Sequence, residues 1–240
     1  MYTEEQLEKF RKIIDGSRRA VFFGGAGVST ESGIPDFRSQ DGLYKLKYAY
    51  PPEYILSATF FRTHTAEFFE FYRDKMLYTS AKPNAAHLKL AEWERSGKLA
   101  AVITQNIDGL HQAAGSKNVL ELHGSVWRNK CVKCGKKYPL EVVADSVGIP
   151  RCACGGVIKP QVVLYEESLD SSTLEKSVDY IRSADTLIIG GTSLNVYPAA
   201  GLIDFFEGDN LVVVNKGETA RSVNGSLVID SPIAEFFARV

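Results

Sequence analysis

The sequence predicts an α/β protein built on a doubly wound parallel sheet, with a second, smaller domain. Short apolar runs alternate with helical stretches along most of the 240-residue chain, as in strands joined by helical crossovers. A glycine-rich segment follows the first apolar run, where sheets of this class bind ligands. Four cysteines lie within residues 131–154, and their clustering indicates a separate small unit.

The composition is that of an ordinary globular protein. Apolar residues make up 45% of the chain and charged residues 24%, so neither disorder nor a fibrous repeat is expected. A formal net charge of -1 supplies no overall field for nucleic acid or an acidic membrane. The first residues lack the features of a secretory signal, and no apolar run approaches the roughly 18 residues of a spanning helix. We therefore expect a cytoplasmic protein with no membrane partner.

Local patterns predict the helices and strands in order. Thr3 and Gln6 form a capping box before a helical repeat that ends at Gly16. Six short apolar runs suit strands buried on both faces of a parallel sheet: residues 20–23, 99–104, 119–122, 186–189, 211–215 and 227–229. Further helices are expected at residues 85–96, 172–183, 199–206 and 233–239.

The cysteine spacing predicts a structural zinc site. Cys131 and Cys134 form a C-x-x-C pair, and Cys152 and Cys154 follow after 17 residues as a C-x-C pair. Four thiolates of this kind close tetrahedrally on one Zn²⁺ ion, and a site without an open position stabilises the fold. The second pair is one residue shorter than usual, and the glycines at residues 155–156 would relieve its tight turn. A redox-active cysteine pair is the alternative.

Residues 25–27, Gly-Ala-Gly, directly follow the first predicted strand. Such glycines allow a tight turn and a close backbone approach to phosphate. The third glycine comes only at Gly33, later than in the dinucleotide fingerprint, so a plain strand-to-helix turn is the alternative. Phe37 and Arg38 then offer a ring to cover a ligand and a guanidinium to pair with phosphate, although singly they also fit a core ring and a surface cation.

Polar side chains follow other predicted strands. Residues 105–108, Gln-Asn-Ile-Asp, come after Thr104, at the edge where open α/β sheets bind ligands; an Asx turn capping the next helix is the alternative. His123 follows another short strand and suits proton transfer near neutral pH, although a lone histidine is more often structural. Residues 191–193 and Asn215 occupy equivalent places after two later strands, where ordinary turns are the alternative.

Five motifs occur in one order over nearly the whole chain: residues 25–38 (GAGVSTESGIPDFR), 104–111 (TQNIDGLH), 121–125 (ELHGS), the four cysteines, and 191–194 (GTSL). Together they resemble the signature of the sirtuins, the NAD-dependent protein-lysine deacylases. The resemblance implies a Rossmann-like doubly wound parallel sheet with a small zinc-ribbon domain and a helical insertion.

The resemblance also implies roles for individual residues. His123 would be the catalytic base toward a ribose hydroxyl, Asn106 would place a water, and Asp108 would hold the nicotinamide carboxamide. Zinc would be held by Cys131, Cys134, Cys152 and Cys154 as one structural ion. The NAD-binding set would be Gly25, Ala26, Gly27, Thr30, Phe37, Arg38, Gln105, Asn106, Ile107, Asp108, His123, Gly191, Thr192, Ser193, Asn215 and Ile233.

Acetylated-lysine proteins or peptides are the implied substrate. A peptide would add as a strand beside Val163 and Tyr165, so that backbone hydrogen bonds give affinity with little sequence readout; two ordinary strands are the alternative. This chain has Tyr-Glu-Glu at residues 165–167 where the family commonly has Phe-Gly-Glu. Members that prefer acidic acyl groups carry a tyrosine and an arginine where this chain has Phe69 and Tyr72, so desuccinylation is not expected.

The implied reaction consumes NAD. The acyl oxygen attacks the ribose as nicotinamide leaves, and the products are free lysine and O-acetyl-ADP-ribose. Protein mono-ADP-ribosyl transfer is an alternative that uses the same cleavage. A noncatalytic zinc-ribbon module is another, with nucleic acid bound through Arg128, Lys130, Lys133, Lys136 and Lys137. A binding module has no use for a base at His123, so no nucleic-acid partner is expected.

The motifs also divide the chain. Residues 1–34, 84–123 and 162–240 are expected to form the Rossmann-type NAD-binding domain. Residues 35–83, rich in aromatic side chains, would be a cofactor loop followed by a helical insertion. Residues 124–161, which carry every cysteine, would be the zinc ribbon.

Overall fold

The larger part of the protein is a six-stranded parallel sheet with the strand order β3-β2-β1-β7-β8-β9. The structure is a computed structural model that describes residues 2–37, 49–217 and 227–240. The strands are β1 (Ala20–Gly24), β2 (Leu99–Thr104), β3 (Val119–Glu121), β7 (Thr186–Gly190), β8 (Asn210–Asn215) and β9 (Leu227–Asp230). All six lie within one residue of the runs predicted from the sequence, and every pairing is parallel.

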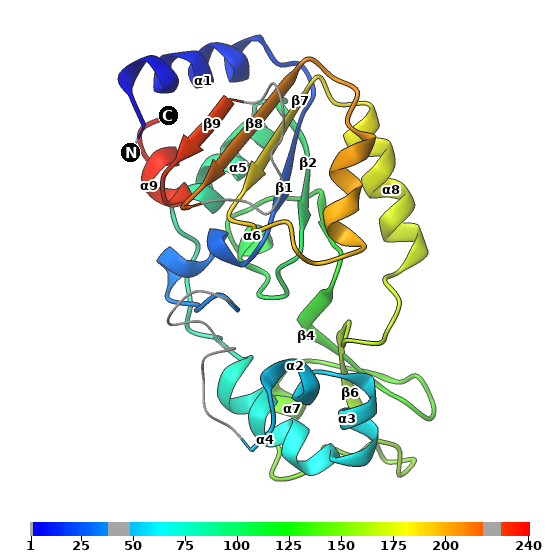
Figure 1. Cartoon of the computed structure of the whole chain (residues 1–240). Coiled ribbons are helices and arrows are strands. Elements are labelled where there is room, and N and C mark those ends of the chain that lie inside the picture. The colour runs from blue at the N-terminus through cyan, green and yellow to red at the C-terminus, as the bar shows by residue number, and fades with distance from the viewer. Residues whose placement is uncertain (1, 38–48, 218–226) are drawn as a thin grey trace.

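Helices cover both faces of this sheet, as Figure 1 shows. On one face Phe22 packs with residues of α1 (Glu4–Gly16), α5 (Ala85–Arg95) and α9 (Ile233–Phe237). On the other face Val21 and Phe23 pack with α8 (Ser171–Arg182) and the 3-10 helix η4 (Ala199–Phe205). Successive residues of a strand point to opposite faces, so the unbroken apolar runs supply two cores. This confirms the doubly wound α/β prediction.

Two predicted helices differ from the observed ones. The helix expected at residues 199–206 is the 3-10 helix η4, because the segment is short and contains Gly201, which weakens an α-helix. The helix expected at residues 233–239 ends as α9 at Phe237. The capping box is confirmed: Thr3 Oγ1 accepts from Gln6 N at 3.2 Å, and Gln6 Oε1 accepts from Thr3 N at 2.9 Å.

The smaller part is a three-stranded antiparallel sheet, β5-β4-β6, with short helices around it (Figure 1). Its strands are β4 (Gly124–Cys131), β5 (Lys137–Tyr138) and β6 (Ile158–Val162), and α7 is Glu141–Ala144. The insertion contributes α2 (Pro52–Ile55), α3 (Ala58–Thr63) and α4 (Thr65–Lys75). Three further short helices belong to the larger part: η1 (Ala26–Val28), η2 (Thr30–Ser32) and α6 (Leu110–Ala113).

The insertion and the cysteine module share one hydrophobic core. Phe60, Phe68 and Phe69 of the insertion lie in the same buried cluster as Cys131 and Cys152. Within the insertion, Phe61 and Phe68 pack edge to face with their centroids 5.0 Å apart, and Phe68 stacks on Tyr72. The two segments that interrupt the strand-helix alternation therefore stabilise each other.

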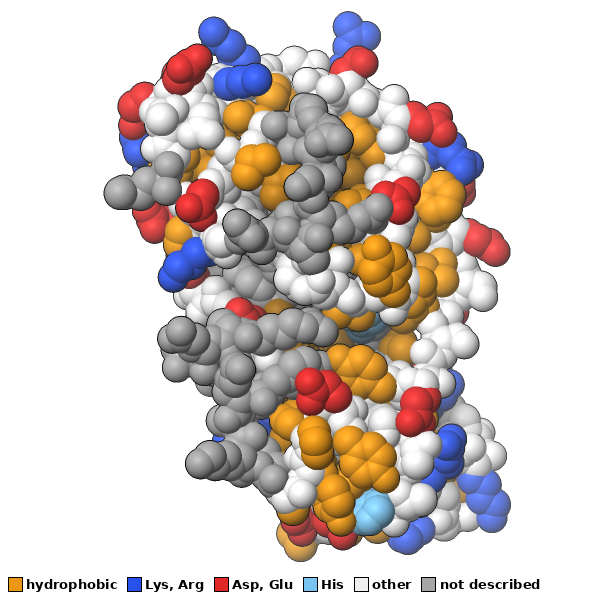
Figure 2. All heavy atoms as spheres, in the orientation of Figure 1, with side chains coloured by type: hydrophobic (Ala, Val, Ile, Leu, Met, Phe, Trp, Pro, Cys, Tyr) orange, Lys and Arg blue, Asp and Glu red, His pale blue; other side chains and the backbone are white. Residues whose placement is uncertain are grey.

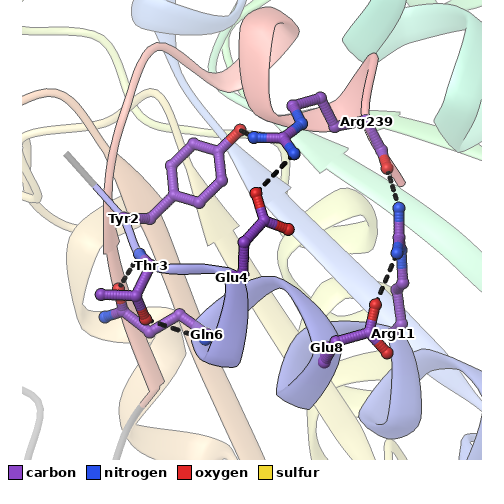
Figure 3. A network of polar contacts seen from close by, with 7 residues as sticks. All are labelled: Tyr2, Thr3, Glu4, Gln6, Glu8, Arg11 and Arg239. Carbon is purple, nitrogen blue, oxygen red and sulfur yellow. Dashed lines mark hydrogen bonds and ion pairs between the residues drawn. The ribbon is translucent and has the colours of Figure 1, made fainter.

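The two ends of the chain are tied to each other (Figure 3). Arg239 Nη2 donates to Glu4 Oε1 at 2.6 Å, and Arg239 Nη1 donates to the hydroxyl of Tyr2 at 3.3 Å. Arg11 donates to Glu8 Oε1 at 2.6 Å and to the carbonyl oxygen of Arg239. These contacts hold α1 against the end of α9. None of the helices formed by the described residues has the length and apolar character needed to cross a bilayer.

Candidate active site

A cavity of about 1000 Å³ lies between the carboxyl edge of the parallel sheet and the smaller part. The segments that follow β1, β2, β3, β7 and β8 all contribute to its wall, which is the position expected for a ligand in an open α/β sheet. The smaller part closes it with Leu56, Val126 and Leu164. In Figure 2 the surface narrows between the two parts, and hydrophobic side chains gather beside this waist.

The glycine segment brings two strand-end loops into contact. Gly27 N donates to Gly191 O at 2.8 Å, and Gly25 N donates to Gly190 O at 3.3 Å. A Cβ on Gly27 would lie 2.8 Å from the Cα of Gly191, and one on Gly25 would lie 2.9 Å from the Cβ of Thr192. Larger residues would push the loops apart, so the two glycines allow the loops after β1 and β7 to pack in direct contact at the cavity wall. Ala26 and Thr30 complete this side of the wall.

The segment after β2 is held by a network around Ser29. The Ser29 hydroxyl donates to Asp108 Oδ2 at 2.7 Å and accepts from Asn106 Nδ2 at 3.1 Å. Asp108 Oδ1 accepts from Leu110 N at 2.9 Å, so the Asx turn considered as an alternative is present as well. Burial raises the pKa of Asp108, and its hydrogen bonds partly offset the rise. Asn106 and Asp108 both line the cavity with Ile107 between them.

His123 is oriented by the backbone. Its Nδ1 lies 2.9 Å from the carbonyl oxygen of Gln105. A carbonyl can only accept, so in this contact Nδ1 carries the hydrogen and Nε2 of the neutral ring keeps its lone pair. Burial lowers the pKa of His123, an effect that the Gln105 hydrogen bond partly offsets. The half-buried ring lines the cavity, and the lowered pKa favours its neutral form, in which Nε2 is able to accept a proton.

The remaining predicted cofactor residues line the same cavity where the structure describes them. Gln105 Nε2 donates to Thr192 Oγ1 at 3.1 Å, which links the loops after β2 and β7. Ser193, Asn215 and Ile233 lie along the wall with Gly191. Phe37 lines the wall and packs against the core of the smaller part. Arg38 lies outside the described residues.

The predicted substrate residues follow β6 at the cavity lip. Val163 N donates to the carbonyl oxygen of His123 at 2.9 Å, so this segment is tied directly to the candidate base. Tyr165 forms an isolated parallel bridge with Ser57. Of residues 162–165 only Val162 lies within β6, because Val163 N donates to His123 O and Tyr165 N donates to the carbonyl oxygen of Leu56 in the insertion. Both Val163 and Tyr165 line the cavity.

Glu166 adopts a conformation that usually requires glycine. Its φ is 74°, in the left-handed region that L residues rarely enter. Glu166 Oε2 accepts from Thr59 N at 2.9 Å and from the Thr59 hydroxyl at 2.7 Å. These two hydrogen bonds stabilise the carboxylate and are the main reason that the pKa of Glu166 is lowered. They join the lip to the start of α3 and offset the backbone strain.

The four cysteines form a metal-binding constellation. Their sulfur atoms all lie within 4.8 Å of one another, and Cys131 Sγ is 3.5 Å from Cys154 Sγ. Gly155 has a φ of 81°, and a Cβ on Gly156 would lie 2.6 Å from Cys131 Sγ. The two glycines thus permit the short C-x-C turn, as the sequence predicts. The residues fit one zinc ion held by four thiolates, and Tyr138 donates to Cys152 Sγ at 3.0 Å.

Sequence reasoning missed two residues at the site. Ser29 has no pattern of its own, although it lies within the first motif, and its role appears only when β1 and β2 are placed side by side. Trp127 lies in β4, and its Nε1 donates to the carbonyl oxygen of Asp108 at 2.7 Å. A tryptophan two residues after the ELHGS motif is the sequence signal that could have indicated it.

Comparisons with known proteins agree with this geometry. A family model described as the Sir2 family matches residues 25–198. The NAD-dependent protein deacetylase of Clostridium acetobutylicum is 58% identical over 240 residues, which is 98% of each chain. That of Clostridium perfringens is 54% identical over 241 residues, 99% of each chain.

Solved structures give the same result. A Sir2 complex with a p53 peptide and NAD⁺ has a TM-score of 0.86 at 40% identity, covering 97% of this chain and 96% of that one. A Sir2 variant with a deacetylated p53 peptide and 3'-O-acetyl-ADP-ribose has a TM-score of 0.89 at 40% identity, with the same coverage. The matched family region includes the cavity motifs and all four cysteines. The chain therefore belongs to the Sir2 family, the sirtuins.

Proposed function

We propose that this chain is an NAD-dependent protein-lysine deacetylase that releases nicotinamide and O-acetyl-ADP-ribose from acetyl-lysine substrates. One observation carries the proposal: His123, Asn106 and Asp108 line a single cavity at the carboxyl edge of the sheet, in a chain 58% identical to an enzyme of that name. A cavity of about 1000 Å³ has room for a dinucleotide together with an acyl-lysine side chain.

The chain's own residues divide the work. Bound NAD supplies an electrophilic ribose carbon as nicotinamide departs. His123, neutral and with Nε2 free, accepts the proton of a ribose hydroxyl. Asp108 and Ile107 hold the carboxamide, and Asn106, fixed by Ser29, places a water. Phe37 shields the reacting carbon from bulk solvent.

The remaining predicted residues bind the rest of the dinucleotide, the peptide and the zinc ion. The loops around Gly25, Gly191 and Asn215 hold the rest of the dinucleotide, and the backbone at Ile233 closes over the adenine. The peptide pairs with the segment of Val163 and Tyr165, which His123 O and Leu56 O already anchor through backbone hydrogen bonds. The zinc ion is structural, because the four thiolates of the cysteine site complete its coordination.

Acetyl-lysine is preferred over succinyl-lysine. Phe69 and Tyr72 are fully buried in the core of the smaller part, and burial raises the pKa of Tyr72. Neither residue supplies a cation for a carboxylate. Arg73 lies next to Tyr72, but its guanidinium donates to Ser146 Oγ at 3.1 Å and to Gly148 O at 3.0 Å.

Two alternatives remain as outcomes of the test. Mono-ADP-ribosyl transfer would use the same cavity with another acceptor. Nucleic-acid binding through the cysteine module has less support, because Arg128 pairs with Glu121 at 2.6 Å and Lys133 donates to Cys154 O at 3.3 Å. A cytoplasmic location and the absence of membrane and nucleic-acid partners stay predictions.

The test is an assay with NAD and matched acetyl-lysine and succinyl-lysine peptides, read by mass spectrometry. We expect deacetylated peptide and O-acetyl-ADP-ribose in equal amounts, and little desuccinylation. His123→Ala should lower turnover by roughly 10²- to 10⁴-fold, the usual contribution of a general base, while NAD binding persists. Protein carrying ADP-ribose would favour the transferase instead, and unchanged turnover in His123→Ala would remove the proposed base.

A further inference from the structure

The loop after β2 is held by three hydrogen bonds from the segment that follows β3 and enters β4. His123 Nδ1 donates to Gln105 O at 2.9 Å, Val126 N donates to Ile107 O at 3.0 Å, and Trp127 Nε1 donates to Asp108 O at 2.7 Å. All three donors belong to residues 123–127. The carbonyl oxygens of three loop residues therefore accept hydrogen bonds from the candidate base and from two residues of β4.

Trp127 is the member of this set that reaches Asp108. A Cβ on Gly109 would lie 2.6 Å from Trp127 Nε1, so the indole packs directly on the backbone of the loop. Gly109 has a φ of 76°, which glycine adopts without strain. The next amide, Leu110 N, donates to Asp108 Oδ1. The indole thus holds the backbone carbonyl of Asp108, while the amide of Leu110 holds its carboxylate.

The indole also lies where a ligand in the cavity would change its surroundings. Trp127 lines the cavity and is 44% exposed. Its strand begins immediately after His123 and ends at Cys131 of the cysteine site. One strand therefore connects the candidate base, the Asp108 loop and the metal-binding cysteines.

We infer that Trp127 is a positioning residue that orients Asp108 for the carboxamide of nicotinamide. The inference rests on the proposed function, because it assigns the group that Asp108 receives. Without the indole N–H, Asp108 O loses its hydrogen-bond donor and the loop can tilt. The binding of nicotinamide and of NAD then becomes weaker. The backbone amides of the peptide segment are held elsewhere, Val163 N by His123 O and Tyr165 N by Leu56 O, so we expect acetyl-peptide affinity to be unaffected.

The experiment compares wild type with Trp127→Phe, which keeps a ring over Gly109 and removes the donor. The inhibition constant of nicotinamide and the KM for NAD should each rise roughly 2- to 10-fold, the range expected for the loss of one net hydrogen bond. The KM for the acetyl peptide should change less than about 2-fold. Lys130→Gln is the matched control, since Lys130 is an exposed residue of the same strand and should change none of these values.

Fluorescence gives a second readout. The chain has two tryptophans, and Trp93 is buried in the core of the larger part. Trp93→Phe leaves Trp127 as the sole indole, and its emission should change on addition of nicotinamide with the concentration dependence of inhibition. Trp127→Phe should show no such change.

Equal changes in the KM for NAD and for peptide, or nicotinamide inhibition within 2-fold of wild type in a folded Trp127→Phe, would overturn the inference. If wild type itself neither deacetylates nor binds nicotinamide, the proposed function fails. Hydrogen exchange then decides the positioning role: faster exchange of the Gly109 and Leu110 amides in Trp127→Phe supports it, and unchanged exchange overturns it.

Discussion

His87 and His111 face each other in the interior of the larger part, and neither is a candidate catalyst. Their ring centroids lie 4.7 Å apart. Neither ring nitrogen of His111 has a hydrogen-bond partner among the described residues, nor does Nε2 of His87. Burial lowers the pKa of His87 to about 4. Burial, and then the neighbouring His87, lower the pKa of His111 well below its usual value, so both rings are neutral in the folded chain.

We expect the free energy of unfolding to fall as the pH decreases from about 6.5 toward 4. In this window the unfolded histidines bind protons and the folded His87 and His111 do not, so stability present above the unfolded pKa is lost on acidification. For His87 alone the loss approaches roughly 3 kcal/mol. His111→Leu should flatten this dependence, measured by urea unfolding at several pH values. An equally steep dependence in the variant would contradict the account.

At the scale of elements, the lip of the cavity depends on an ion pair between β6 and the turn that follows it. Lys159 Nζ donates to Glu167 Oε2 at 3.0 Å and to Val162 O at 3.0 Å. Glu167 Oε2 also accepts from Leu164 N at 2.9 Å. The two side chains are only 15% and 32% exposed, so this pair is shielded more than a surface ion pair. It fixes the turn that presents the peptide-pairing segment.

Lys159→Met should raise the KM for the acetyl peptide roughly 3- to 10-fold, because one charge-assisted hydrogen bond to the turn is lost. The KM for NAD should stay within about 2-fold, since the dinucleotide residues lie on other loops. Lys159→Arg should restore part of the peptide affinity, and Glu167→Gln should resemble Lys159→Met. Steady-state kinetics with each substrate varied in turn measures this split. A parallel rise in both KM values would indicate general loosening instead.

At the scale of the whole molecule, the cysteine site stabilises more than its own turns. Cys131 and Cys152 lie in the cluster that contains the aromatic rings of the insertion. That cluster also contains Leu56, Val126 and Leu164, which line the cavity. The metal-binding end of the smaller part is therefore continuous with the candidate active site.

Removing zinc should abolish deacetylation and lower the unfolding temperature, because metal-binding free energy is folding free energy. Adding zinc back should restore both. Cys134→Ser, at the exposed cysteine of the set, should bind zinc more weakly and show the same losses. Native mass spectrometry counts one expected ion per chain, and calorimetry follows unfolding. Metal-free protein that unfolds at the original temperature would argue against a structural ion.

The sequence alone predicted most of the framework and the residues of the candidate site. The strands could be predicted because residues such as those of β2 are buried on both faces and form unbroken apolar runs. The cysteine set followed from its spacing. The short η4 helix was missed as such because 3-10 and α patterns are alike over seven residues. Ser29 was missed because a lone serine carries no periodic signal.

What the sequence by itself determined is what depends on neighbours along the chain: the capping box at Thr3, the six strands, the cysteine pairs and the order of the family motifs. Only the tertiary structure decided that Trp127 donates a hydrogen bond to the backbone of Asp108, that the rings of His87 and His111 contact each other, and that the insertion packs on the cysteine module. Each of these contacts joins segments distant in sequence, and their pairing depends on how strands and helices pack in three dimensions, which local periodicity does not encode.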